Sequence, residues 1–181
     1  YVVSSPSWDN TEGENIGAVT WVNGYACLPY GESERGVFVN PSNSLIGTTD
    51  GDGVGYAVTA LTNGNYVISS PAWDRGIISG AGAATWADGA TGLIGTISSE
   101  NSLLGSSDED YVSGQGIVAL TNGNYVVLSY LWNRPRFDLD IPQYADHDSW
   151  YDAGAATWGN GLTGVVGDIS PNNSLVGAGD R

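Results

Sequence analysis

Apolar and polar residues alternate in short runs along this chain, and turn-forming residues separate the runs. The runs at 57–61 and Tyr66–Ser70 flank the pair Asn63-Gly64. Asn-Gly readily adopts the positive φ angles of a two-residue hairpin turn, so this stretch predicts a β-hairpin. A second hairpin of the same kind is predicted at 117–120 and 125–129, around Asn122-Gly123. No stretch shows an apolar stripe with a helical period, and the pattern therefore indicates an all-β chain.

The hairpins are parts of a longer unit that recurs along the chain. Four motifs return in the same order: a stretch from Tyr-Val to Trp at 1–8, 66–73 and, more loosely, 125–132; Gly-Ala-x-Thr-Trp at 17–21, 82–86 and 154–158; Asn-Ser-Leu at 43–45, 101–103 and 173–175; and Leu-Thr-Asn-Gly-Asn-Tyr at 61–66 and 120–125. A fixed order of motifs in a basic unit of about 58 residues, lengthened by two insertions, is the signature of a tandem repeat.

The spacings divide the chain into three repeats, which we place at 1–56, 57–115 and 116–181. Repeat 1 carries an insertion at 25–35, and repeat 3 carries one at 134–152. Repeats 2 and 3 each predict four short antiparallel strands, whereas repeat 1 begins just after the turn of a hairpin and lacks its first strand.

Four short strands in a unit of this length are typical of a β-propeller blade. The fold class that we predict is therefore all-β, with three antiparallel four-stranded repeats arranged as propeller-like blades. A linear β-solenoid or prism-like stack is the alternative. In either arrangement the recurrent tryptophans fill the space between sheets. These are Trp8, Trp21, Trp73, Trp86, Trp132 and Trp158.

The incomplete first repeat predicts an open sheet edge. Its five residues are Tyr1, Val2, Val3, Ser4 and Ser5. A bare edge invites pairing with another strand. Propellers close with roughly four to eight blades, so three blades would also need material from elsewhere. The expected partners are copies of this chain, or flanking repeats of a longer chain.

The motifs that recur here resemble a known group of repeats. Leu-Thr-Asn-Gly-Asn-Tyr, Pro-x-Trp-Asp, Gly-Ala-Val-Thr-Trp and Asn-Ser-Leu-Val-Gly are similar to tandem repeats of uncharacterised function in large bacterial haemagglutinin-like or adhesin-like surface proteins. The resemblance implies secretion, tandem arrays and a role in adhesion or matrix building. A weaker similarity is to the integrin-type propeller repeat, which often holds calcium in an Asp-rich loop.

Composition and charge limit the kinds of partner that the chain is expected to bind. The chain has 181 residues, 20 acidic side chains against five arginines, and a net charge of -15. Such a charge repels phosphate backbones and anionic lipid, so we expect neither nucleic acid nor membrane insertion. The single Cys27 offers no disulfide partner. Together with the high content of small polar residues, these features indicate an extracellular, cell-surface protein.

Calcium is the ligand that the acidic residues favour. Asp50 and Asp52 follow the fourth strand of repeat 1, and Asp108 and Asp110 hold the equivalent place in repeat 2. Hard cations bind several oxygen ligands in flexible, Gly-rich loops. These four carboxylates therefore form a candidate calcium site, with solvated turn carboxylates as the alternative.

The insertion in repeat 3 departs most from the repeat pattern. It concentrates charged and aromatic side chains: Arg134, Arg136, Asp146, His147, Asp148, Trp150 and Tyr151. Arg, Trp and Tyr are the residues that dominate binding hot spots, so we predict a contact loop for a partner or a neighbouring subunit.

These observations favour a non-enzymatic structural module of a surface adhesin or filament, held together by strand pairing and aromatic packing. The first alternative is a carbohydrate-binding, lectin-like propeller with exposed aromatic platforms. The second is a glycoside-acting enzyme with paired carboxylates. Nucleophilic catalysis has little support, because His147 is the only histidine.

Overall fold

The computed structural model describes residues 1–11, 13–23, 38–135, 149–150 and 152–178. The all-β prediction is confirmed for these residues, which form strands and turns. Within the described ranges there is no helix of the length and apolarity needed to cross a membrane.

Three sheets contain most of the strands, one sheet for each repeat. The first has the order β1 (Val2–Ser5), β2 (Ala18–Trp21), β3 (Ser44–Ile46) and β7 (Gly95–Thr96). The second has the order β14 (Gly167–Asp168), β8 (Ser102–Leu104), β6 (Ala83–Ala87), β5 (Tyr66–Ser70) and β4 (Ala57–Ala60). The third has the order β15 (Ser174–Val176), β13 (Ala155–Gly159), β10 (Tyr125–Ser129) and β9 (Gly116–Ala119). A separate antiparallel pair joins β11 (Arg134–Pro135) to β12 (Ser149–Trp150).

The predicted hairpins lie where the alternation placed them. Strand β4 pairs with β5, and β9 pairs with β10, each across its Asn-Gly turn. Both turn glycines have positive φ, 93° at Gly64 and 87° at Gly123. Each repeat then continues antiparallel through its Gly-Ala-x-Thr-Trp strand to its Asn-Ser-Leu strand.

Two short strands, β7 and β14, were not predicted. Each belongs to the connection between the third and fourth predicted strands of its repeat, and each joins the sheet of the preceding repeat. Strand β7 of repeat 2 pairs in parallel with β3 of repeat 1, and β14 of repeat 3 pairs in parallel with β8 of repeat 2. The first two sheets are therefore completed by residues of the following repeat.

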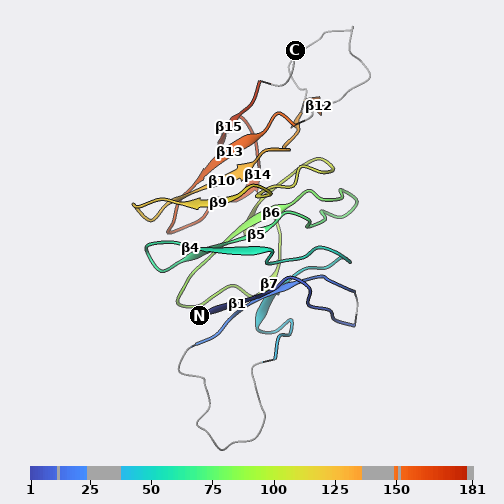
Figure 1. Cartoon of the computed structure of the whole chain (residues 1–181), viewed down its shortest axis with the longest axis vertical. Helices are drawn as coiled ribbons and strands as arrows, with labels where there is room; N and C mark the ends of the chain where they lie inside the picture. The colour runs from blue at the N-terminus through green and yellow to red at the C-terminus, as the bar shows by residue number, and fades with distance from the viewer. Residues whose placement is uncertain (12, 24–37, 136–148, 151, 179–181) are drawn as a thin grey trace, which may run out of the picture.

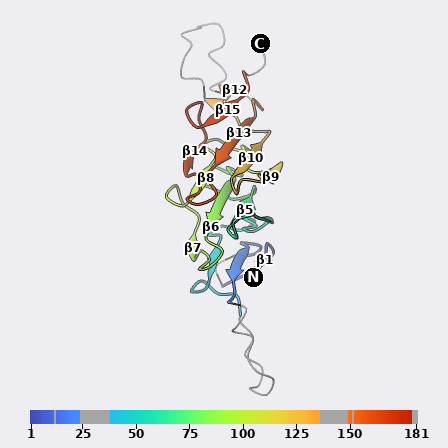
Figure 2. The same cartoon turned by 90° about the vertical axis from the view of Figure 1, so that its left-hand side faces the viewer.

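The three sheets stack along the long axis of the molecule, with repeat 2 between the other two (Figures 1 and 2). Two apolar clusters fill the spaces between them. In the first, Val19 and Leu45 of repeat 1 pack with Tyr66 and Ile68 of repeat 2. In the second, Leu103 of repeat 2 packs with residues of repeat 3, which include Tyr125, Val127 and Trp132. Alternation along each strand thus supplies a different apolar face to each neighbouring repeat.

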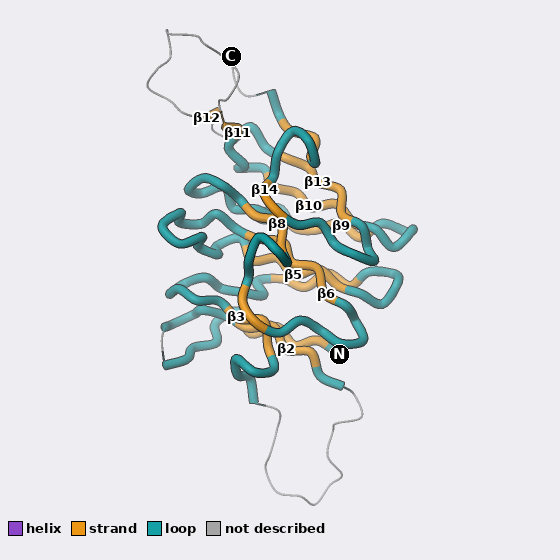
Figure 3. Tube along the Cα trace, turned by 180° about the vertical axis from the view of Figure 1, so that it is seen from behind, coloured by secondary structure: helices purple, strands orange, loops and turns teal. Residues whose placement is uncertain are grey.

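Among the described residues, no sheet covers the outer face of the first or the third sheet. Figure 3 shows the strands of the first and third sheets at opposite ends, and the described residues do not close into a ring. At one end, β1 is the terminal strand of its sheet, so Tyr1–Ser5 lies at a sheet edge in the structure. The all-β, sheet-per-repeat part of the fold prediction is confirmed, and propeller closure is not seen.

Candidate repeat-to-repeat interface

Successive repeats are joined first by the added parallel strands. Gly95 and Thr96 of β7 lie opposite Leu45 and Ile46 of β3. Gly167 and Asp168 of β14 lie opposite Leu103 and Leu104 of β8, and the Ile169 N–H then donates to the Leu104 carbonyl at 3.1 Å. The same pairing therefore occurs at both junctions, which makes it a property of the repeat.

A tryptophan forms the second link at each junction. The Trp21 indole N–H donates to the Gly89 carbonyl of repeat 2 at 2.8 Å, and Trp86 donates to the Gly161 carbonyl of repeat 3 at 3.0 Å. Both acceptors lie in a turn with the sequence Asp/Asn-Gly-x-Thr-Gly, at 88–92 and 160–164. The tryptophan that ends one Gly-Ala-x-Thr-Trp strand is thus bound by the turn of the next repeat.

The second glycine of this turn lies against the tryptophan. A Cβ atom at Gly92 would lie 2.3 Å from the Trp21 Cβ, and Gly92 has a φ of +71°. At Gly164 the corresponding distance to the Trp86 Cβ is 2.9 Å. Only glycine allows this approach and this backbone conformation together. The Gly-x-x-Gly spacing therefore encodes the tryptophan contact.

Asparagines of the hairpin turns add a third link between repeats 2 and 3. The Asn65 side chain accepts a bond from the Gly89 N–H of its own repeat at 3.0 Å and donates to the Gly161 carbonyl at 2.8 Å. The Asn63 side chain donates to the same carbonyl at 2.7 Å. With the Trp86 indole, three donors of repeat 2 converge on one carbonyl oxygen of repeat 3.

A buried carboxylate forms the fourth link. Asp52 of repeat 1 is fully buried. Its Oδ2 accepts bonds from the N–H groups of Thr48 and Thr49, at 2.7 and 2.9 Å, and its Oδ1 accepts one from the Asp74 N–H of repeat 2 at 2.9 Å. Burial raises the pKa of the Asp52 carboxyl, and the bonds from these three N–H groups oppose that rise.

Asp110 repeats this arrangement at the next junction. It is also fully buried. Its Oδ2 accepts bonds from Ser106 and Ser107, at 2.8 and 2.9 Å, and its Oδ1 accepts one from the Asn133 N–H of repeat 3 at 2.8 Å. Burial raises the pKa of this carboxyl as well. Each carboxylate thus fixes the turn after one repeat's last strand to the loop that follows the next repeat's tryptophan, Trp73 or Trp132.

A family model of a repeat matches the chain in four segments. The model, described as a repeat of unknown function (DUF5650), matches residues 1–56, 60–114, 119–140 and 141–181. The chain belongs to this family. The last two matched segments divide inside the predicted insertion of repeat 3, yet strands from both pair in one sheet, since β10 pairs with β13. The tandem-repeat organisation is confirmed, and two of the four matched segments share the third sheet.

The four residues of the calcium prediction fall into two pairs in the DUF5650 repeats. Asp52 and Asp110 have both carboxylate oxygens bound by backbone N–H groups, as described above. Asp50 and Asp108 are exposed and accept single bonds, from the Glu14 N–H at 3.0 Å and the Ser79 N–H at 2.7 Å. The described residues contain no group of three or more His, Cys, Asp or Glu side chains arranged to hold a metal ion. Calcium binding therefore stays a prediction. The geometry shows instead that Asp52 and Asp110 each accept a backbone hydrogen bond from the next repeat.

Most of the predicted contact loop lies outside the described residues. This holds for Arg136, Asp146, His147, Asp148 and Tyr151. Arg134 lies in β11 and faces Trp150 of β12 in the strand register. The equivalent of Arg134 in repeat 2 is Arg75, which forms an ion pair with Asp168 of β14 at 2.8 Å and donates to the Gly105 carbonyl at 3.1 Å. Arg134 therefore occupies a position that at the preceding junction binds the added strand.

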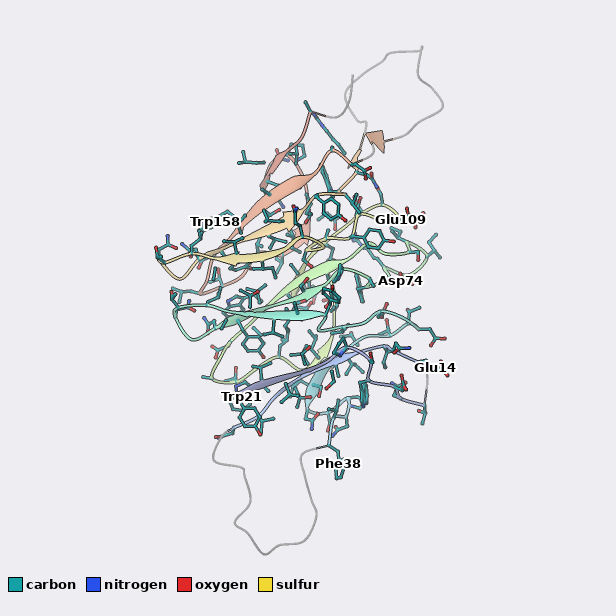
Figure 4. All side chains as sticks on the ribbon, viewed as in Figure 1. Glu14, Trp21, Phe38, Asp74, Glu109 and Trp158 are labelled. Atoms are coloured by element: carbon teal, nitrogen blue, oxygen red, sulfur yellow. The ribbon has the colours of Figure 1, made fainter. Side chains whose placement is uncertain are left out.

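The tryptophans differ from the packing expectation in two respects. Trp73 and Trp132 are buried between sheets, as expected for packing residues. Trp21 and Trp86 are half-buried and donate hydrogen bonds, a role that sequence patterning did not suggest. Trp158 is 53% exposed, and its indole N–H donates to none of the described residues. Figure 4 shows Trp21 and Trp158 on one side of the stack and Glu14, Asp74 and Glu109 on the other.

Two tyrosines give the interfaces a predictable response to alkali. Burial raises the pKa of Tyr66 and of Tyr125 from 10.0 to about 12. A raised tyrosine pKa stabilises the folded state fully below pH 10, and this contribution is lost as the pH rises towards 12. We expect unfolding in this interval, with a loss of about 3 kcal/mol per tyrosine. The double variant Tyr66→Phe/Tyr125→Phe should lose less stability over the same interval, as measured by circular dichroism alongside tyrosinate absorbance. An equal loss in both proteins would contradict the prediction.

Proposed function

We propose that this chain is a non-enzymatic structural module of an extracellular adhesin or filament, in which DUF5650 repeats stack one upon the next. The observation that carries the proposal is the equivalence of the two junctions. Each uses a parallel strand, a tryptophan indole and a buried aspartate at corresponding positions. A contact that joins one face of a unit to a different face of the next continues without limit unless it closes into a ring.

The mechanical role follows from the kinds of contact at each junction. Main-chain pairing, buried charge-assisted hydrogen bonds and an apolar cluster act together between neighbouring sheets. Stability in such arrays is the sum of nearest-neighbour terms, so more repeats make a longer and more persistent rod. The net charge of -15 and the resemblance to adhesin-like surface repeats support a place outside the cell.

The carbohydrate-binding alternative depends on exposed aromatic platforms. Trp21 and Trp86 are engaged by the following repeat, so among the Gly-Ala-x-Thr-Trp tryptophans a sugar platform would have to use Trp158. A glycan array compared between the wild type and Trp158→Ala tests this directly. Glycan binding that is lost in the variant would support the lectin-like function over the structural one.

The structural function is tested on the native protein. We expect antibodies raised against this chain to label the surface of intact cells of the source organism. We expect negative-stain images of the labelled material to show extended rods whose length grows with the number of DUF5650 repeats. Closed rings, or labelling only after the cells are permeabilised, would contradict the proposal.

A further inference from the structure

The third sheet exposes the face that the first two sheets bury. Leu45 and Leu103 are fully buried beneath the following repeat, whereas the equivalent Leu175 is 81% exposed. The strand register places Leu175 beside Ala156, Ala156 beside Leu128, and Trp158 beside Val126. These residues form one apolar face of the third sheet, which we call the open face. In the first two repeats the corresponding face is a repeat-to-repeat interface.

The open face is bordered by an unpaired strand edge. In the first two sheets, the edge beyond the Asn-Ser-Leu strand is occupied by β7 or β14. In the third sheet, no strand of the described ranges pairs with that edge of β15. The main chain at Ser174–Val176 therefore presents the edge that a parallel strand fills at the other two junctions.

The hydrogen-bond donors of the junction are also present at the open face. Asn122, Asn124 and Trp158 occupy the places of Asn63, Asn65 and Trp86, whose side chains converge on the Gly161 carbonyl. Asn124 already accepts a bond from the Gly161 N–H at 3.0 Å, as Asn65 does from Gly89. The Trp158 indole N–H bonds to none of the described residues.

We propose that the open face binds the turn-and-strand segment of another DUF5650 repeat, of the kind found at 160–170 in this chain. This inference rests on the proposed function and names the partner of its interface. The turn of the segment would receive the Trp158 indole, and its short strand would pair in parallel with β15. The binding mode is strand addition with an aromatic anchor.

The positive charge of Arg134 indicates which kind of repeat the open face binds. Arg134 holds the place of Arg75, whose partner at the preceding junction is Asp168. A segment with aspartate at this position, as in repeat 3, supplies the matching carboxylate, whereas repeat 2 carries Thr96 there. Repeat 1 carries Phe38 at this position, because the Asn43 side chain donates to the Phe38 carbonyl as the Asn173 side chain donates to the Asp168 carbonyl. The turn of repeat 1 is also interrupted by the insertion at 25–35. The occupant is therefore a repeat with the turn and strand of repeat 3, and not repeat 1 of a second copy.

The test uses the full chain and a synthetic peptide with the sequence of residues 160–170. Isotope-labelled protein is titrated with the peptide and followed by NMR. We expect saturable shifts at the Trp158 indole and at Ser174–Val176. We expect the Trp158→Ala variant to bind at least about tenfold more weakly, since an aromatic anchor carries much of such an interface. Trp158 is exposed, so this variant should keep the fold of the wild type, which its spectrum checks directly.

Two altered peptides serve as matched controls. A peptide with Gly164→Ala should fail to bind, because at the existing junction a Cβ there would lie 2.9 Å from the tryptophan Cβ. A peptide with Asp168→Asn should bind the wild-type protein several-fold more weakly than the unaltered peptide does. The Arg134→Ala protein should bind the two peptides equally. Absence of saturable binding would overturn the inference, as would shifts centred on Leu103 and Leu104 or equal binding of the Gly164→Ala peptide. None of these results depends on where the protein resides, so they are separable from a failure of the surface-module proposal.

Discussion

Asp110→Asn is expected to destabilise the protein by about 3 kcal/mol, because one of the two oxygens of a fully buried carboxylate that binds three backbone N–H groups is replaced by an NH₂ group. The wild-type carboxylate accepts from Ser106, Ser107 and Asn133 with its two oxygens. An Asn amide keeps one acceptor oxygen and turns an NH₂ group towards at least one of these donors. Asp52→Asn should cause a similar loss at the first junction. Urea unfolding followed by circular dichroism measures both.

The neighbouring carboxylates provide the controls for these variants. Asp50 and Asp108 lie two residues earlier in the same turns, are exposed, and accept one backbone bond each. Asp50→Asn and Asp108→Asn remove the same charge and should change the free energy of unfolding by less than about 1 kcal/mol. If the buried and exposed variants lost equal stability, the loss would come from the change in net charge. The hydrogen bonds of the buried carboxylates would then not be what stabilises the junctions.

Gly92→Ala is expected to cost about 2–4 kcal/mol, with about 1 kcal/mol from the positive φ and the rest from overpacking against Trp21. The new Cβ would lie 2.3 Å from the Trp21 Cβ, so either the ring or the turn must move. Because the Trp21 indole binds Gly89 in the same turn, this movement also strains the hydrogen bond between repeats 1 and 2. Urea unfolding measures the loss.

A second glycine separates the two causes. Gly76 has a φ of +65° and nothing within 4 Å of a Cβ placed there, so Gly76→Ala reports the backbone cost alone. The double variant Trp21→Ala/Gly92→Ala should be more stable than the sum of the single losses predicts, because the clash disappears with the ring. Strict additivity would mean that the alanine does not act through Trp21.

Much of the fold was predictable because local signals fix it. The Asn-Gly pairs and the alternation on either side specify the hairpins that β4 and β5, and β9 and β10, form. Strands β7 and β14 were missed for a physical reason. Each has two residues, too few to show a period, and each finds its partner in another repeat.

The interface was predictable only in part. Asp52 and Asp110 stood out as carboxylates in Gly-rich turns, but composition alone cannot show that backbone N–H groups from two repeats converge on them. The turn Asp/Asn-Gly-x-Thr-Gly did carry a usable signal, since it recurs in repeats 2 and 3 and is interrupted in repeat 1. The Arg75–Asp168 pair had no such signal, because the equivalent positions in repeat 1 and at the first junction are Asn10 and Thr96.

The parallel strands β7 and β14 link the completion of each sheet to the order of translation. A sheet whose last strand is supplied by its successor stays one strand short while the ribosome is still making that successor. Each newly translated repeat therefore emerges with an unfinished neighbour beside it to receive its connecting segment. At both junctions the strand that completes a sheet belongs to the repeat translated next, so the order of synthesis favours the correct pairing.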